Sequence, residues 1–263
     1  MKWIRKILQK VLSEKQYLLL LATGFQRLFK TGKLGSEYQD IYFLKKIIRP
    51  GDHCVDIGAH LGYYTLQFSR LAGEEGKVIA IEPVSKFNAV LRKLTSGNRF
   101  RNVRIHQVAL GGKGEFVEIG IPRVNNQKKF GYARIRELSE WMEYDETEKV
   151  KNVSGDLLLS ELPRIDFIKC DVEGAEVPVF ASMPTVLQRH KPVLLCELAD
   201  KNELIKMYGM LHPLSYETYI LKNGRLHETE VQSDERAISH NYYFIPNSRL
   251  SHYKPVIAVS GKE

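Results

Sequence analysis

Short apolar runs that end in a glycine, a proline or a carboxylate recur along this chain, and segments with the helical spacing of apolar residues separate them. The apolar runs are residues 54–57, 78–81, 103–110, 165–170 and 193–196. Strands that helices cover on both faces have this unbroken apolar character. Helices are predicted at residues 36–48, 63–71, 85–94 and from about 176 to 189. The alternation predicts an α/β fold with a mostly parallel, Rossmann-like sheet.

Two more strand candidates close the chain, at residues 216–221 and 241–246. Asn223 and Gly224 follow the first, and this pair is typical of a type I′ hairpin turn because both of its central residues adopt positive φ, so residues 225–228 are expected to pair with that strand. We therefore expect two antiparallel strands at the C-terminal edge, which complete a seven-stranded sheet.

The loop after the first strand has the spacing Asp-x-Gly-x-x-x-Gly, at Asp56, Gly58 and Gly62. Gly58 permits a tight turn, and Gly62 lets a helix begin close to the sheet. The backbone N–H groups of Ala59 and His60 then face a crevice in which a ligand can bind. Because a carboxylate opens this loop and few glycines cradle a phosphate, it suits S-adenosylmethionine better than NAD.

The ends of the next two strands reach the same edge of the sheet. Glu82 and Pro83 follow the second strand, and an acidic side chain about 20 residues beyond the loop is placed to accept hydrogen bonds from ribose hydroxyls. Ala109 lies near the end of the third strand, where residues 107–110 are candidates for an adenine pocket. A plain strand end explains that last segment equally well.

Charged residues gather after the fourth and fifth apolar runs. Lys169, Asp171, Glu173 and Glu176 lie around the end of one strand, and Glu197 ends the next. Carboxylates concentrated where a parallel sheet presents ligands indicate a functional site. For Glu173 and Glu176 a structural alternative remains, since both also favour a helix N-terminus through its dipole.

Like charges this close must share a proton, pair with a cation or hold a metal ion. We favour Asp171 as the base or the ligand of a substrate hydroxyl, with Lys169 setting its charge and with Glu173 and Glu197 orienting the acceptor. A Mg²⁺ ion bridged by Asp171 and Glu197 is the alternative, and no metal ligand is assigned.

Residues 115–153 lose the regular pattern and include a charged run at 143–151. We expect an insertion of short antiparallel strands and a mobile loop there. Cys54, Cys170 and Cys196 fall inside predicted strands and have no metal-ligand spacing. They are expected to be reduced core residues, which indicates a cytoplasmic protein.

The net charge of +8 lies wholly in residues 1–49, which hold 11 Lys and Arg against 3 Asp and Glu, whereas the rest of the chain holds 28 of each. The region after residue 49 therefore has no basic bias of the kind that a nucleic-acid groove requires. Residues 2–12 have the pattern of a basic amphipathic helix. The apolar run at 18–22 is too short to cross a membrane.

Two interpretations of the helical extension at residues 1–49 stay open. Its helices pack on the α/β domain and cover the cofactor mouth, or its basic helix makes weak contact with an anionic membrane surface. The second would place a cytoplasmic protein at the periphery of a membrane.

Residues 55–65, Glu82-Pro83, residues 166–176 and Glu197 together resemble the FkbM family of S-adenosylmethionine-dependent methyltransferases. The resemblance covers about residues 50–200, and its specific part is Lys-x-Asp-x-Glu-Gly-x-Glu, because many unrelated methyltransferases share the first motif. It implies a class I methyltransferase fold and, usually, methylation of a hydroxyl oxygen. His60 departs from the family, which more often has Asn there. The helical extension and the insertion fall outside the resemblance, and we expect them to determine substrate choice.

We therefore expect a methyltransferase domain at residues 50–263 that transfers a methyl group from S-adenosylmethionine to a hydroxyl of a sugar, a polyketide or another small metabolite, with no nucleic-acid partner. Two alternatives remain. One is a non-catalytic module that binds a nucleotide or a partner on the same fold. The other is an NAD-dependent oxidoreductase, which the glycine spacing disfavours.

Overall fold

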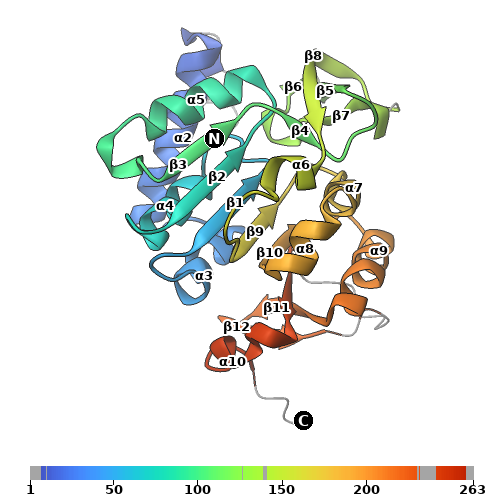
Figure 1. The fold of residues 1–263 in the computed structure, drawn as a ribbon. Coiled ribbons are helices and arrows are strands. Elements are labelled where there is room, and N and C mark those ends of the chain that lie inside the picture. The colour runs from blue at the N-terminus through green and yellow to red at the C-terminus, as the bar shows by residue number, and fades with distance from the viewer. Residues whose placement is uncertain are drawn as a thin grey trace.

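The computed structural model describes residues 7–9, 11–125, 127–138, 141–229, 231 and 241–258. Its centre is an eight-stranded sheet in the order β12-β11-β13-β10-β9-β1-β2-β3 (Figure 1). The parallel strands are β1 His53–Ile57, β2 Lys77–Ile81, β3 Val103–His106, β9 Phe167–Cys170 and β10 Val193–Glu197. The antiparallel edge consists of β11 Tyr216–Lys222, β12 Arg225–Glu228 and β13 Asn241–Pro246. The predicted α/β class and mixed sheet are confirmed.

The sheet has one strand more than the seven expected, because the hairpin strand β12 pairs along β11 and joins it. Asn223 and Gly224 connect the two strands with φ values of 52° and 71°. Positive φ at both positions is what a type I′ turn requires.

The third predicted strand, residues 103–110, is wrong in its second half. β3 ends at His106, and Ala109–Leu110 forms β4 in a second sheet, parallel to β8 Tyr144–Val153. Since β3 is the edge of the central sheet, the chain beyond it finds its backbone partners on β8 instead.

This second sheet is the insertion expected at residues 115–153, and it also contains β5 Phe116–Val124, β6 Gln127–Lys128 and β7 Arg134–Ile135. The antiparallel pairing is confirmed, but the charged run is part of the long strand β8 and not a loop. Its charged side chains stay partly or fully exposed while the strand pairs with β5. Charge therefore did not prevent strand formation here.

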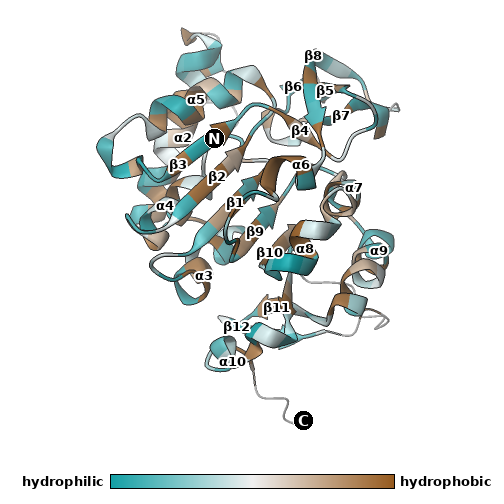
Figure 2. Ribbon diagram, viewed as in Figure 1, coloured by the Kyte–Doolittle hydropathy of each residue, from teal (hydrophilic) through white to brown (hydrophobic). Residues whose placement is uncertain are grey.

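Helices cover both faces of the central sheet (Figure 1). They are α3 Gln39–Ile47, α4 Thr65–Ala72, α5 Ser85–Thr95, α6 Gly155–Leu159, α7 Glu176–Ala181, α8 Pro184–His190, α9 Lys201–Leu211 and α10 Leu250–Tyr253. Alternate residues of one strand enter different cores, as a pleated strand requires. In β1, Val55 packs with the α7–α9 side and Cys54 with the α3 and α4 side. Figure 2 shows the apolar strands of the sheet between helices that carry both polar and apolar residues. All three cysteines are buried and free, as predicted.

Helix α2, Glu14–Lys30, is fixed onto this domain. Ser13 caps it in a reciprocal capping box with Gln16. Leu18 is fully buried, and Phe25 stacks on Tyr63 with the ring centroids 3.9 Å apart. The packing interpretation therefore holds for this part of the extension. Most of the predicted helix at residues 2–12 lies outside the described residues, although residues 7–9 and 11 are helical.

No described helix is both long enough and apolar enough to pass through a lipid bilayer.

Candidate active site

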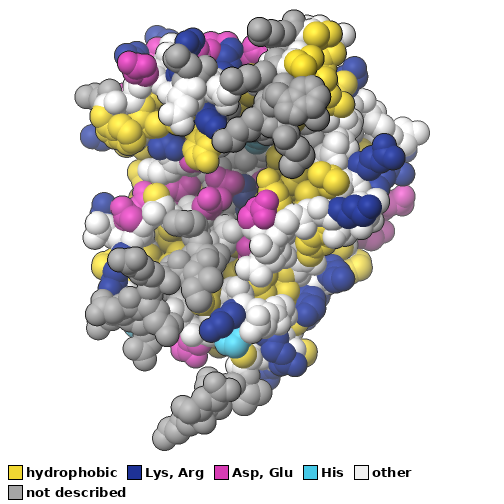
Figure 3. Space-filling model, turned by 180° about the vertical axis from the view of Figure 1, so that it is seen from behind, with side chains coloured by type: hydrophobic (Ala, Val, Ile, Leu, Met, Phe, Trp, Pro, Cys, Tyr) yellow, Lys and Arg dark blue, Asp and Glu magenta, His cyan; other side chains and the backbone are white. Residues whose placement is uncertain are grey.

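A cavity of about 610 Å³ opens where β1, β2, β9 and β10 end. Seen from behind, a hollow in this face is lined by acidic side chains (Figure 3). Eleven of the predicted site residues line the cavity: Asp56, Gly58, Ala59, His60, Glu82, Pro83, Ala109, Lys169, Asp171, Glu173 and Glu197. Residues predicted from separate motifs thus come together at one place.

Gly62 is the predicted residue that does not line this cavity. Its φ is +80°, and a Cβ atom there would lie 2.6 Å from Leu91 Cδ1 on α5. Gly62 is therefore required for the close approach of α5, and no contact with a ligand follows from its position.

Asp56 is buried at the end of β1, where it is 1% exposed. Thr65 at the start of α4 donates a hydrogen bond to its Oδ2, whereas its Oδ1 has no partner among the described residues. Burial raises the pKa of Asp56, while nearby Lys169 opposes the shift. An unpartnered carboxylate oxygen in the cavity wall can accept a hydrogen bond from a bound ligand.

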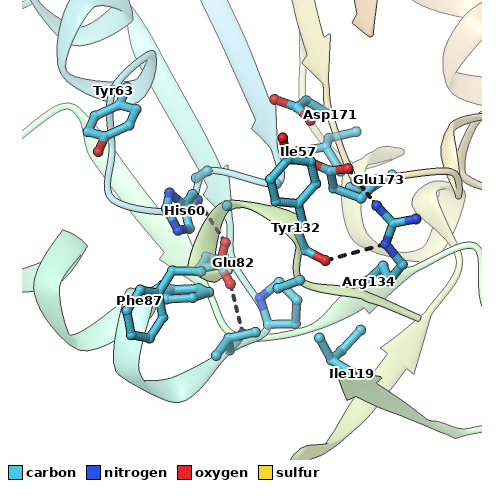
Figure 4. A pocket seen from close by; sticks show the side chains of 18 of the residues that line it. Ile57, His60, Tyr63, Glu82, Phe87, Ile119, Tyr132, Arg134, Asp171 and Glu173 are labelled. Atoms are coloured by element: carbon cyan, nitrogen blue, oxygen red, sulfur yellow. Dashed lines mark hydrogen bonds and ion pairs between the residues drawn. The ribbon is translucent and has the colours of Figure 1, made fainter. Parts of the chain in front are cut away.

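Glu82 ties together the loops after β1 and β2. Its Oε2 accepts the backbone N–H of His60 at 2.7 Å and its Oε1 that of Val84 at 2.8 Å, as Figure 4 shows. Burial raises the pKa of Glu82 to about 8, against the effect of these two N–H groups. A carboxyl group has about four acceptor positions, so two hydrogen bonds leave capacity for hydroxyl groups of a ligand.

His60 lies beside Glu82 in the cavity and has the left-handed φ of 47°. Its ring packs edge-on against Phe87, with the centroids 4.3 Å apart (Figure 4). Burial lowers the pKa of His60 to about 4, so the imidazole is neutral near pH 7. Its Nε2 has no hydrogen-bond partner among the described residues.

Lys169, which is buried, and Asp171, which is partly exposed, form an ion pair at the end of β9, with Nζ and Oδ2 2.8 Å apart. The ammonium also lies 4.8 Å from the ring centroid of Tyr64. Burial alone would lower the pKa of Lys169, but the carboxylates of Asp171 and Asp56 raise it above its ordinary value. Lys169 is therefore a cation, and the expectation that it sets the charge of Asp171 agrees with this contact.

Glu173 and Glu176 have different surroundings. Glu173 has φ +59° and faces the cavity, where its Oε2 lies 2.9 Å from Nη2 of Arg134 (Figure 4). Glu176 is 1% exposed and accepts the backbone N–H groups of Val172 and Gly174. Glu176 thus has a structural role, through hydrogen bonds to the loop before α7 and not through the helix dipole that the alternative invoked.

The sequence did not identify Phe130, Tyr132 and Arg134, which come from the insertion and line the cavity. Tyr38 of the extension also lines it. The available signal was a cluster of three basic and two aromatic residues from Lys128 to Arg134, within a segment that lacks strand or helix periodicity. Such a cluster does not by itself indicate that the residues line a cavity, so the fold was needed to place them.

The cavity fits S-adenosylmethionine in size and in chemistry. Its volume lies within the range of about 300–1,000 Å³ that small-molecule sites occupy. Asp56 Oδ1 and His60 Nε2 are buried polar atoms without a described partner, and Glu82 has unused acceptor capacity. In the part of the chain that the structure describes, no three His, Cys, Asp or Glu side chains are grouped as a metal site would require.

Comparison with solved structures identified proteins of low sequence identity. An FkbM methyltransferase from Methylobacillus flagellatus has 17% identity and a TM-score of 0.47, with 91% of this chain and 57% of that chain covered. An S-adenosylmethionine-dependent O-methyltransferase from Thermotoga maritima has 16% identity and a TM-score of 0.42, with 78% and 63% covered. This chain thus spans less than two thirds of either protein. No similar curated protein was found.

The family comparison is more extensive. Residues 56–219 match the model of the methyltransferase FkbM domain, a family that uses S-adenosylmethionine. The match begins at Asp56 and includes the insertion, which we had expected to fall outside the similarity. Since it covers more than half of the sequence, the chain belongs to the FkbM family of methyltransferases, which have the class I fold.

Proposed function

We propose that this protein is an S-adenosylmethionine-dependent O-methyltransferase that acts on a hydroxyl group of a sugar, a polyketide or another small metabolite. The observation that carries the proposal is the shared cavity. Glu82 and His60 line one part of it, and Asp171 and Glu173 line another, and the close-up shows these two pairs on opposite sides of Tyr132 (Figure 4). Such a cavity has room for a methyl donor and an acceptor side by side.

On this proposal, the residues of the β1 and β2 loops hold the cofactor. Glu82 accepts hydrogen bonds from the ribose hydroxyls, Asp56 accepts from the amino group, and the backbone from Gly58 to His60 contacts the amino-acid part. Pro83 and Ala109 line the adenine side. When bound, S-adenosylmethionine supplies an electrophilic methyl group on its sulfonium sulfur.

The acceptor side has to position a hydroxyl and remove its proton. As the hydroxyl oxygen bonds to the methyl carbon, the carbon–sulfur bond breaks and the hydroxyl proton moves to Asp171. Lys169 pairs with Asp171 and holds its carboxyl group in place, and Glu173 and Glu197 orient the acceptor. Positioning and a nearby base are the two contributions that such a transfer needs from a protein.

Two alternatives differ in what they bind. A non-catalytic module would bind a nucleotide or a partner without turnover, and an oxidoreductase would bind NAD. A thermal-shift experiment with S-adenosylhomocysteine and NAD distinguishes them, because only a ligand of the native state raises the melting temperature. We expect stabilisation by S-adenosylhomocysteine alone. Stabilisation by NAD alone would contradict the proposal.

A Mg²⁺ ion bridged by Asp171 and Glu197 is the mechanistic alternative to a simple base. EDTA should leave turnover unchanged if Asp171 acts directly on the acceptor. Loss of turnover with EDTA and its recovery with added Mg²⁺ would replace our assignment by the metal model.

We also propose that the extension at residues 1–49 brings this cytoplasmic protein into weak contact with anionic membranes. Val11, Leu20 and Leu28 are 74%, 44% and 45% exposed. Basic residues accompany them, and the following four are exposed and have no ion-pair partner among the described residues: Lys15, Arg27, Lys30 and Lys33. Exposed apolar and basic side chains on one segment favour an anionic lipid surface.

A further inference from the structure

One segment of the insertion crosses the cavity. All residues from Gln127 to Ile135 line it, and we call residues 127–135 the strap. The strap includes β6, a 3₁₀ turn at Phe130–Tyr132 and β7. It therefore forms part of the wall of the proposed acceptor site.

Both ends of the strap are held by the rest of the domain. Lys128 pairs with Glu146 on β8, and the ring of Phe130 packs near Tyr17 and Phe87 at centroid distances of 6.1 and 6.2 Å. At the other end Ile135 is buried and pairs with β5. These contacts fix where the strap begins and ends.

The middle of the strap has few such contacts. A Cβ atom built on Gly131 would have no heavy atom within 4 Å, and Tyr132 is 51% exposed although it lines the cavity. Figure 4 shows the Tyr132 ring between Glu82 and Glu173. Something else must therefore hold this ring over the site.

Arg134 makes the contacts that do so. Its Nη2 lies 2.9 Å from Glu173 Oε2, and its Nε donates to the Tyr132 carbonyl oxygen at 3.3 Å. One guanidinium thus joins the middle of the strap to the loop that follows β9. Its side chain is 17% exposed and that of Glu173 25%, so water screens this pair less than a surface ion pair.

We propose that Arg134 is a positioning residue of the acceptor site, which ties the strap to Glu173 and so holds both Tyr132 and the Glu173 carboxylate against the acceptor. The inference rests on the proposed function for the identity of the acceptor site. The tie itself is a property of the free protein.

The surroundings of Glu173 explain why it needs a cation. Burial and the nearby carboxylate of Asp171 together raise the pKa of Glu173 to about 8, although Arg134 opposes both effects. The other charged groups that face it are Glu197 and Glu176, and both raise its pKa. Without Arg134 the carboxylate would be surrounded by like charges and would be protonated at higher pH values.

The wild type, two variants of Arg134 and one control variant test the tie. Arg134→Gln removes the charge, and Arg134→Lys keeps the charge without the planar donor group. The matched control is Arg136→Gln, because Arg136 lies in the same insertion and pairs with Glu118 at 2.8 Å but does not line the cavity. Hydrogen exchange of residues 127–135 reports the strap, and carbon-13 NMR of labelled glutamate reports the titration of Glu173, with Glu173→Gln to assign its signal.

In Arg134→Gln we expect at least about tenfold faster exchange in the strap and a Glu173 midpoint about one pH unit higher than in the wild type. Arg134→Lys should accelerate the exchange and keep the midpoint close to that of the wild type. Arg136→Gln should change neither. Unchanged exchange and an unchanged midpoint in Arg134→Gln would overturn the tie.

Calorimetry with S-adenosylhomocysteine separates this proposal from the proposed function. All four forms should bind it within about threefold of the same affinity, because Arg134 lies on the acceptor side. Absence of binding in the wild type would contradict the proposed function and leave the hydrogen-exchange and NMR result for the tie standing. A large loss of binding in Arg134→Gln alone would overturn the assignment of Arg134 to the acceptor side.

Discussion

Gly58 lies directly against the main chain of Asp171, so that a Cβ atom on Gly58 would be 1.9 Å from the Asp171 carbonyl oxygen. The loop after β1 and the loop after β9 are thus in contact without an intervening side chain. On the proposed function, this contact sets the distance between the cofactor loop and the base.

Gly58→Ala should disrupt this contact and lower both stability and ligand affinity. Its φ of +78° already disfavours a side chain, and the clash with Asp171 adds to that strain. Gly32→Ala is the matched control, because Gly32 follows the end of α2 with φ +68° and no heavy atom lies within 4 Å of a Cβ atom built there. We expect the control to lose about 1 kcal/mol and Gly58→Ala to lose clearly more in denaturant unfolding. Equal losses would show that the Asp171 contact is unimportant.

Measured at about pH 9, where the Glu82 carboxyl with its pKa of about 8 is ionised, Glu82→Ala should weaken binding of S-adenosylhomocysteine by about 1.5–3 kcal/mol, the range for hydrogen bonds to a charged group. It should also destabilise the fold, since it removes the acceptors of the His60 and Val84 N–H groups. Glu148→Ala controls for the structural part, because Glu148 accepts the N–H of Ser85 outside the cavity. Calorimetry should show weaker binding only for Glu82→Ala. Unchanged affinity there would remove the ribose site from Glu82.

The pH dependence of stability should report Glu176. Burial raises its pKa from 4.5 to about 7. A raised folded-state pKa means that the protonated form stabilises the fold below pH 4.5, and that this stabilisation is lost as the pH rises to about 7. Glu176→Gln does not titrate. Wild-type stability relative to this variant should therefore fall by roughly 3 kcal/mol between pH 4.5 and 7. A difference that is constant across this range would contradict the pKa shift.

Deletion of residues 1–12 should reduce binding to vesicles that contain anionic lipids by about tenfold or more, since each basic residue near such a surface contributes about 1 kcal/mol. The deletion ends before Ser13, which caps α2, and before Glu14, which pairs with Lys86. Sedimentation at low and high salt measures the binding, and neutral vesicles are the control. Unchanged binding together with unfolding of the truncated protein would show that the segment only packs.

Much of the fold and of the cofactor side followed from local sequence. Parallel strands end at one edge, so Asp56, Glu82 and Lys169 could be brought together once their strands were recognised. The strand after His106 was misjudged because apolar character does not reveal which sheet a strand joins. Gly62 was assigned to the cofactor because sequence alone does not show that Leu91 of α5 is its neighbour.

The acceptor side was less predictable. Arg134 meets Glu173 across 39 residues of sequence, and no periodicity links the two. Glu173 and Glu176 are three residues apart in one motif, yet one faces the cavity and the other holds its own loop. The positive φ angles at Glu173 and Gly174 separate their directions, and the sequence does not specify the one at Glu173.

Methyl transfer by wild-type protein and by Asp171→Asn tests the central claim most directly. Small-molecule extracts incubated with S-adenosylmethionine carrying a trideuterated methyl group should yield a product whose mass increases by one labelled methyl group. Asp171→Asn should bind S-adenosylhomocysteine normally and form that product about 10²–10⁴-fold more slowly, the usual contribution of a positioned base. Full activity of Asp171→Asn would contradict the assigned base, and absence of any labelled product with the wild type, across extracts rich in sugars and polyketides, would contradict the proposed function.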